Sequence, residues 1–322
     1  MLLLAHLLDD WLDFRYAEVF ELLRMHGYRP EEAILCNRHW RDDDAASHHY
    51  DITAYAHLSE AECVAYWEAK RGLVPGTIDH FMLLSLPNEH VAKQIFSRAV
   101  LVKGLYELYT MAETFEENVS FTSSFSVPSL QSQIESCEDT WCIQVVSFSR
   151  TLSMQVKSTL RNRFSFLPFR GAVSLSEPQR IFSIFLDFSR HVDHRVKIPE
   201  DDERLLNPPV PTYFTRALLL SPLKSVLQKF SLKQRIYLGP TSLDEQLAFV
   251  MCNLSAVSNG TTVWEPFVGT GGLAVCAAYR GAFVLGSDID IRVLKGLRHA
   301  GPTENLNGSP NVIPNGNVKQ VG

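Results

Sequence analysis

The sequence has few of the residues that mark secreted or metal-stabilised proteins. Its 322 residues include only six cysteines, which are scattered and form no Cys-x-x-Cys pair. This usage favours a reducing compartment, so we expect a cytoplasmic chain without a structural zinc or other metal site of its own. No apolar run approaches the roughly 18 residues that a membrane-spanning helix requires. The apolar start meets Asp9 and Asp10 too soon to be a signal peptide, so no membrane association is expected.

The sequence also lacks an overall basic charge, since its net charge is −6. The charge is divided unevenly along the chain. Residues 1–139 hold 10 basic and 23 acidic residues, whereas residues 140–243 hold 15 basic and 7 acidic residues. The middle segment alone could therefore bind an anionic partner such as a nucleic acid.

The most basic run lies between Asp139 and Glu177, where no acidic residue occurs. Its cations are interleaved with phenylalanines, and together these residues are Phe148, Arg150, Lys157, Arg161, Arg163, Phe164, Phe166, Phe169 and Arg170. Phosphates are bound by Lys and Arg, and bases stack on exposed aromatic rings. We therefore take Lys157, Arg161 and Arg163 as candidate RNA-binding residues. The alternative is that the phenylalanines belong to a core and the charges to a solvated face.

The first 200 residues alternate short β-rich runs with amphipathic stretches. Strands are predicted at Leu2–Leu8, His80–Leu86, Val100–Tyr109, Trp141–Phe148 and Phe182–Phe188, and helices near Asp13–His26 and Glu89–Arg98. The polar residues 29–76 are typical of a surface insertion, and residues 114–137, rich in Ser and Glu, of a loop. The sequence therefore predicts an α+β N-terminal domain over residues 1–200.

The remaining residues predict a second, smaller unit. Residues 201–237 are expected to be a linker, because their first part is charged and rich in proline. Residues 238–295 begin with a predicted capping box, Ser242 to Glu245, and continue as helix, strand, loop, helix and strand. This order is that of a Rossmann-type α/β fold. Residues 296–322, rich in Asn, Gly and Pro, are expected to be a disordered tail.

A glycine loop follows the first strand of this smaller unit. The six residues from Gly269 fit the pattern G-x-G-x-x-[GA], and Asp288 lies 19 residues beyond Gly269, at the end of the next strand. Such a loop aims backbone amides at a ligand, and the acid can accept hydrogen bonds from a ribose diol. Glu265 can face the cationic end of a methionine moiety but would repel a pyrophosphate. The pattern favours S-adenosylmethionine, with a dinucleotide as the alternative.

Several stretches resemble one known family. They are residues 235–253, the Glu-Pro-Phe-Val-Gly-Thr-Gly-Gly run from Glu265, the Gly-Ser-Asp-Ile-Asp run ending at Asp290, Trp11–Arg15 and Phe166–Phe169. The chain resembles the eukaryotic tRNA guanine-10 N2-methyltransferase catalytic subunit. The resemblance implies an RNA-binding THUMP-type domain followed by a Rossmann-type methyltransferase domain. It also implies S-adenosyl-L-methionine as cofactor, tRNA as substrate and a small zinc-binding activator protein as partner.

The resemblance also implies which residues bind the cofactor, namely Glu265, Phe267, Gly269, Gly271 and Asp288. The family usually has Asp where Glu265 stands. The longer side chain of Glu, with one more methylene, can still bind the cofactor. The catalytic Asp-Pro-Pro-Tyr motif of the family does not occur in this sequence. We therefore expect an incomplete methyltransferase domain, name no catalytic residue, and expect the chain to be inactive by itself. The alternatives are a non-catalytic tRNA-binding module and a nucleotide-dependent oxidoreductase.

Overall fold

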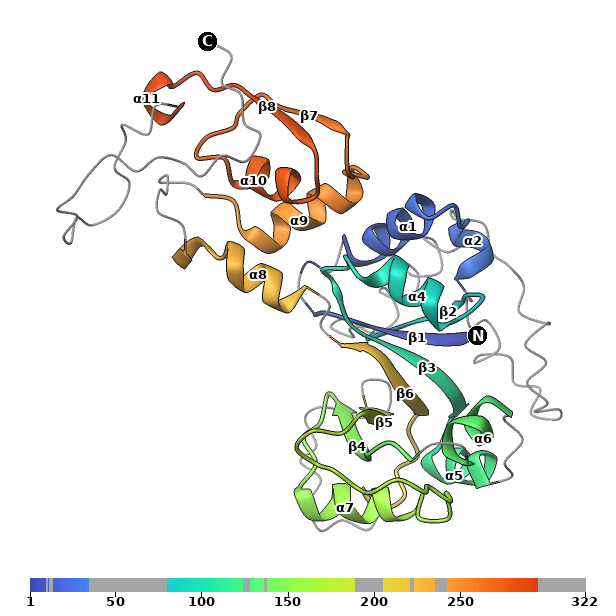
Figure 1. The fold of residues 1–322 in the computed structure, drawn as a ribbon. Helices are drawn as coiled ribbons and strands as arrows, with labels where there is room; N and C mark the ends of the chain where they lie inside the picture. The colour runs from blue at the N-terminus through green and yellow to red at the C-terminus, as the bar shows by residue number, and fades with distance from the viewer. Residues whose placement is uncertain are drawn as a thin grey trace. The chain divides into compact units, whose positions relative to one another are not determined.

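The computed structural model divides into two compact units, each built from several stretches of the chain (Figure 1). It describes residues 1–9, 11, 14–34, 80–123, 128–135, 138–188, 205–220, 223–234 and 242–294. Unit 1 takes residues 1–9, 30–94 and 103–220, and unit 2 takes residues 10–29, 95–102 and 221–322. Most of the predicted 29–76 insertion and the predicted 296–322 tail lie outside the described residues.

A six-stranded sheet forms the centre of unit 1, in the order β2-β1-β3-β6-β5-β4. Its strands are β1 (Leu2–Leu7), β2 (Phe81–Ser85), β3 (Val102–Ala112), β4 (Trp141–Phe148), β5 (Arg180–Asp187) and β6 (Thr212–Leu220). β1–β2, β3–β6 and β5–β6 pair antiparallel, whereas β4–β5 pair parallel. The strands expected from the β-rich runs are confirmed, with ends shifted by a few residues.

The helices of unit 1 include two where the sequence predicted a loop. These two are α5 (Phe115–Ser123) and α6 (Pro128–Glu135), and the others are α2 (Pro30–Ala33), α4 (Glu89–Phe96) and α7 (Met154–Asn162). The loop prediction for residues 114–137 is wrong over α5 and α6. At the start of α5, Thr114 and Glu117 form a capping box. Each side chain accepts a hydrogen bond from the backbone amide of the other, at 3.2 Å.

Two phenylalanines of the basic run are core residues and the other two pack against the core, which favours the alternative interpretation of these rings. Phe148 and Phe164 are buried, and Phe166 and Phe169 pack against the cluster that α5, α6 and α7 form with one face of the sheet. Phe169 stacks on Trp141 with the ring centroids 4.0 Å apart. Burial removes Phe148 and Phe164 as stacking platforms for bases, whereas Phe166 and Phe169 are only partly buried.

The predicted linker over residues 201–237 is wrong in its middle. Residues 212–220 form β6, which lies inside the sheet between β3 and β5. The strand also carries Arg216, whose guanidinium bonds to Glu107 at 2.8 Å and Glu89 at 2.7 Å. The prolines that suggested a linker precede this strand and leave its amides free to pair with both neighbours.

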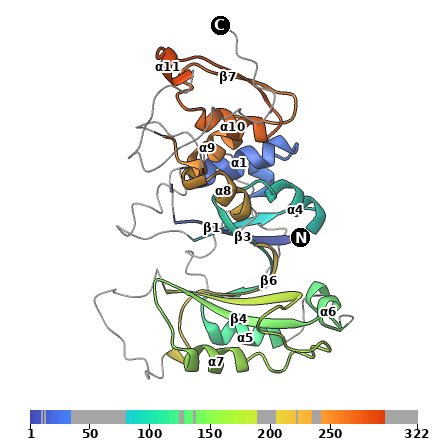
Figure 2. The same cartoon turned by 60° about the vertical axis from the view of Figure 1, so that its left-hand side comes forward.

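Unit 2 contains the predicted strand–loop–helix–strand element (Figures 1 and 2). Its elements are α1 (Arg15–Met25), α8 (Lys224–Phe230), the 3-10 helix η6 (Leu232–Gln234), α9 (Glu245–Leu254), β7 (Thr262–Glu265), α10 (Gly272–Tyr279), β8 (Phe283–Gly286) and α11 (Ile291–Leu294). β7 and β8 pair parallel. Among the described residues, no helix has the length and apolar character that crossing a membrane requires.

The cap of α9 differs from the prediction. The helix begins at Glu245, so the N-cap position falls on Asp244 instead of Ser242. The Asp244 carboxylate accepts a hydrogen bond from the Leu247 amide at 3.1 Å. Asp satisfies an orphan amide at a helix start as well as Ser does.

Candidate cofactor site

The loop between β7 and α10 is fixed by the residue that follows β8. The Ser287 amide donates to the carbonyl of Glu265 at 3.0 Å, and the Ser287 carbonyl accepts from the Val268 amide at 2.9 Å. The Ser287 hydroxyl donates to the Pro266 carbonyl at 3.1 Å. The carboxyl ends of the two parallel strands therefore form one edge, where ligands of α/β folds bind. The sequence pattern did not indicate a role for Ser287.

The two glycines of the pattern adopt left-handed backbone conformations. Gly269 has φ +52° and Gly271 has φ +77°. A Cβ at either position would meet no atom closer than 3.9 Å, so conformation rather than crowding requires glycine there. Gly271 is also the N-cap of α10 and provides no side-chain cap. The open space beside both glycines lets a ligand approach the backbone closely.

Asp288 joins the glycine loop to the end of β8. One carboxylate oxygen accepts from the Gly269 amide at 2.8 Å, and the other accepts from the Asp290 amide at 2.9 Å. A carboxylate offers about four lone-pair sites, so both oxygens can still accept hydrogen bonds from a diol. Asp288 is thus placed to orient the loop and to contact a ligand.

Glu265, the last residue of β7, carries a half-buried carboxyl group. Its half-buried carboxylate accepts a hydrogen bond from the Ala274 amide in the first turn of α10, which replaces the cap that Gly271 cannot provide. Burial raises the pKa of Glu265 to about 7. Its Oε2 atom is buried and has no hydrogen-bond partner among the described residues. A cationic ligand group would satisfy this oxygen.

The structure therefore brings all five predicted cofactor residues to one loop and the strand end beside it. Phe267 follows Glu265 in that loop, and 85% of its side chain is exposed. An exposed aromatic ring next to the glycines is free to cover an apolar part of a ligand. A nucleoside with a cationic chain therefore fits the residues present, through Glu265 for the cation and Asp288 for the ribose.

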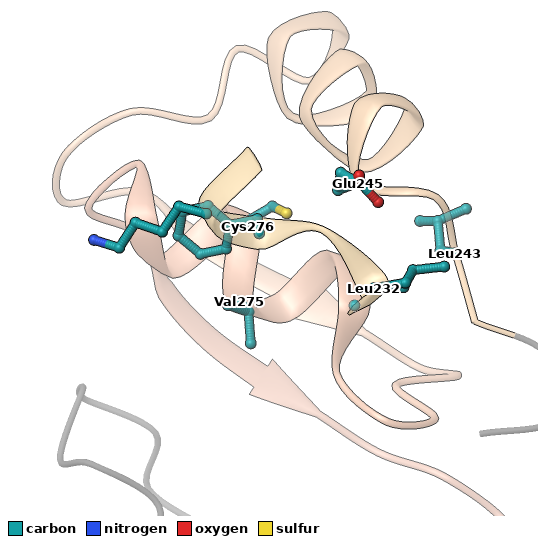
Figure 3. Close-up of a pocket in the computed structure, with 8 residues that line it drawn as sticks. Leu232, Leu243, Glu245, Val275 and Cys276 are labelled. Atoms are coloured by element: carbon teal, nitrogen blue, oxygen red, sulfur yellow. The ribbon is translucent and has the colours of Figure 1, made fainter. Parts of the chain in front are cut away.

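A small pocket lies beside the first turn of α10 (Figure 3). It is lined by Lys229, Phe230, Leu232, Leu243, Glu245, Gly272, Val275 and Cys276. Its volume is about 60 Å³. This is well below the roughly 300–1,000 Å³ of typical small-molecule sites, so the pocket does not hold a nucleoside by itself. Local sequence patterns could not reveal it, because α8, η6, α9 and α10 contribute to its wall.

The predicted RNA-binding residues lie on and just after α7. Lys157 and Arg161 are four residues apart and share one face of the helix. Arg161 donates to the Ser158 hydroxyl at 3.1 Å within the same helix. Arg163 instead donates to both carboxylate oxygens of Glu116, at 2.6 and 2.9 Å. The structure thus leaves the Arg163 guanidinium already paired with an acid.

Comparison with protein families defines the class of both parts of the chain. Residues 77–205 match the family described as the Tmrp11 THUMP N-terminal domain. Residues 233–299 match the RMKL-like methyltransferase domain. The chain thus combines a THUMP-type domain with a methyltransferase domain.

Individual relatives are similar to this chain over most of its length. The chain is 34% identical over 234 residues to the tRNA (guanine(10)-N(2))-methyltransferase TRMT11 of Rattus norvegicus, covering 70% of this chain and 48% of the relative. It is 27% identical over 219 residues to the tRNA (guanine(10)-N(2))-methyltransferase of Saccharomyces cerevisiae, covering 67% and 47%. The chain is therefore a homologue of the tRNA (guanine(10)-N(2))-methyltransferases and spans about half the length of these relatives.

A solved structure with a related arrangement is TrmN from Thermus thermophilus. The two sequences are 16% identical, the match covers 72% of this chain and 64% of TrmN, and the TM-score is 0.38. A likeness at this level assigns no function.

Proposed function

We propose that the chain serves methyl transfer from S-adenosyl-L-methionine to the N2 amine of a guanosine in tRNA by binding the cofactor and the tRNA. By itself it is inactive, because the Asp-Pro-Pro-Tyr motif does not occur in this sequence. The names of its relatives and the two matched domains support this reaction. The observation that carries the proposal is the site itself, in which an orphaned carboxylate oxygen of Glu265 lies beside a left-handed glycine loop. The cofactor, when bound, supplies an electrophilic methyl group on a cationic sulfur.

Each residue of the loop has a separate role in this proposal. The Glu265 carboxylate attracts the cationic methionine end, and burial strengthens that attraction because less solvent screens it. The Asp288 carboxylate accepts hydrogen bonds from the ribose hydroxyls while it keeps Gly269 in place. Gly271 admits the ligand to the start of α10, and Phe267 covers an apolar part of it.

The main alternative is a dinucleotide cofactor of an oxidoreductase. A pyrophosphate would need free amides at the start of α10. The Ala274 amide of this turn already donates to Glu265. A second negative charge beside that carboxylate would be repelled, so the geometry favours the cationic cofactor.

We propose that α7 provides the phosphate contacts of the tRNA. Lys157 and Arg161 present two cations on one face of the helix, which suits a run of phosphates. Arg163 can join them only if it leaves Glu116, so its contribution should be the smallest of the three.

A partner and a location complete the proposal. The resemblance to the family supports a small zinc-binding activator protein as partner. The few scattered cysteines support a cytoplasmic location, and Cys142, Cys252 and Cys276 form no disulfide among the described residues.

The proposal is tested by titrating the chain with S-adenosylmethionine and with S-adenosylhomocysteine, the product form of the cofactor, in a calorimeter. Glu265→Ala should weaken binding of S-adenosylmethionine more than that of the uncharged-sulfur product, because it removes the partner of the cation. Asp244→Asn is the matched control, since it removes one carboxylate of the same unit and keeps the cap of α9. NAD binding that survives excess S-adenosylmethionine would favour the oxidoreductase. If the chain binds tRNA but binds neither S-adenosylmethionine nor NAD, the non-catalytic module is favoured.

A further inference from the structure

A buried polar network joins the N-terminal helix α1 to the methyltransferase part of unit 2. Its centre is Glu18, whose side chain is fully buried. The carboxylate accepts from the amides of Val100 and Leu101, at 3.0 and 2.7 Å, and from the side-chain amide of Asn253 in α9, at 2.6 Å. Burying a carboxylate costs free energy unless hydrogen-bond donors surround it. The fold therefore depends on keeping these three donors around Glu18.

Arg98 extends the network to the ends of both helices that precede the strands. Its guanidinium donates to the Asn253 side chain and to the Val257 carbonyl, each at 2.8 Å. Its own carbonyl accepts from Asn253 at 3.0 Å and from the Arg280 guanidinium at 3.1 Å. Asn253 lies in the last turn of α9, and Arg280 is the C-cap of α10. We call Glu18, Arg98, Asn253 and Arg280 the helix-end clamp.

The clamp lies at the amino ends of β7 and β8, opposite to the glycine loop. After α9 the chain turns through Ala256, a non-glycine residue with φ +49°, directly before the Val257 carbonyl that Arg98 holds. The two turns that enter the strands are themselves joined, because the Gly260 amide donates to the Gly281 carbonyl at 3.0 Å. The clamp therefore fixes the entry point of both strands.

The strands are too short to absorb a displacement of their entry points. β7 and β8 have four residues each, which at about 3.3 Å per residue is a length of about 13 Å. Glu265 is the last residue of β7, and Asp288 follows β8 by two residues. A shift at the clamp is therefore passed to the cofactor loop as a shift of the whole strand pair.

We propose that Glu18 is a positioning residue for the cofactor loop, acting through Asn253 and the entry to β7 across 235 residues of sequence. The inference rests on the proposed function only where cofactor binding is the measurement. It also makes residues 10–29 and 95–102 integral parts of the methyltransferase unit, so a fragment that begins after residue 200 would lack both.

The test compares Glu18→Gln with Glu21→Gln in the full chain. Glu21 lies on the same helix and pairs with Arg24 at 2.6 Å near the surface, so it controls for loss of a carboxylate from α1. The glutamine side chain has one acceptor oxygen instead of two, so at least one of the buried donors around position 18 loses its partner. Hydrogen exchange of residues 262–272 should become about tenfold faster, which matches the loss of a hydrogen bond to a charged group. The dissociation constant of S-adenosylhomocysteine should rise about three- to tenfold.

The other outcomes separate positioning from a purely structural role. Asn253→Ala should give the same change, and the double variant should add little, because both act through one bond. Faster exchange with an unchanged dissociation constant for the folded protein would overturn the positioning role. Unchanged exchange would overturn the whole inference. If the wild-type chain does not bind S-adenosylhomocysteine, the proposed function fails, and exchange in residues 262–272 still decides whether Glu18 holds the loop.

Discussion

The amide of Gly269 donates a hydrogen bond of 2.8 Å to the carboxylate of Asp288, which lies 19 residues further along the chain. This bond closes the glycine loop onto the end of the next strand. An acid that is expected to bind a ribose therefore also holds the backbone that faces the ligand. The two roles predict different consequences for different substitutions.

Asp288→Asn should weaken S-adenosylhomocysteine binding by about tenfold or more, because its amide group turns a donor toward a backbone donor. Asp288→Ala should weaken binding further and also speed hydrogen exchange at residues 266–272. Calorimetry and exchange measured on the same samples test both expectations. Equal affinity of Asp288→Asn and the wild type would show that the carboxylate does not serve the site.

The raised pKa of Glu265 predicts a pH-dependent stability. Burial raises it from 4.5 to about 7 in the folded chain. A raised carboxyl pKa stabilises the fold below pH 4.5, and this contribution is lost as the pH rises through 7. The melting temperature of the wild type should therefore fall between pH 5 and pH 8 more steeply than that of Glu265→Gln. Parallel curves for the two proteins would contradict the buried environment of this acid.

The same pKa predicts proton release on cofactor binding. A cation beside Glu265 favours the ionised carboxylate, so S-adenosylmethionine should bind more tightly above pH 7 than at pH 6. Calorimetry in two buffers with different ionisation enthalpies should detect a fraction of a proton released near pH 7. Glu265→Gln should abolish the release.

The cations on α7 predict a salt-dependent interaction with tRNA. Replacing Lys157, Arg161 and Arg163 with Glu should abolish binding in a low-salt gel shift, because each phosphate contact releases a counterion. Of the three single substitutions, Arg163→Glu should reduce the affinity for tRNA least, since Arg163 already pairs with Glu116. Lys103→Glu, an exposed charge reversal on β3 of the same unit, is the control. Wild-type affinity of the triple variant would place the RNA surface elsewhere.

Close packing behind the cofactor loop predicts an effect of a single methyl group. A Cβ on Gly286 would lie 2.8 Å from Cγ2 of Val268. Gly286→Ala should therefore destabilise unit 2 by about 1–3 kcal/mol. The second substitution Val268→Ala should restore part of that loss, because it removes the opposing methyl. Urea unfolding of the single and double variants tests the contact, and strictly additive effects would rule it out.

Local patterns determined much of this protein. Alternating and helical periodicities predicted five of the six strands in the sheet of unit 1 and the order of elements around the glycine loop. The spacing from Gly269 to Asp288 predicted their proximity, because parallel strands joined by a helix place their carboxyl ends at one edge. The left-handed conformations of the two glycines follow from the same local pattern.

Tertiary structure alone decided other features. It showed that β6 is an inner strand, that the phenylalanines of the basic run lie in the core or pack against it, and that Arg163 is paired with Glu116. It also placed Glu18 beside Asn253, a contact between residues 235 positions apart. Burial and long-range hydrogen bonds depend on which surfaces meet when the chain folds, and a local sequence window contains no information about its distant partner.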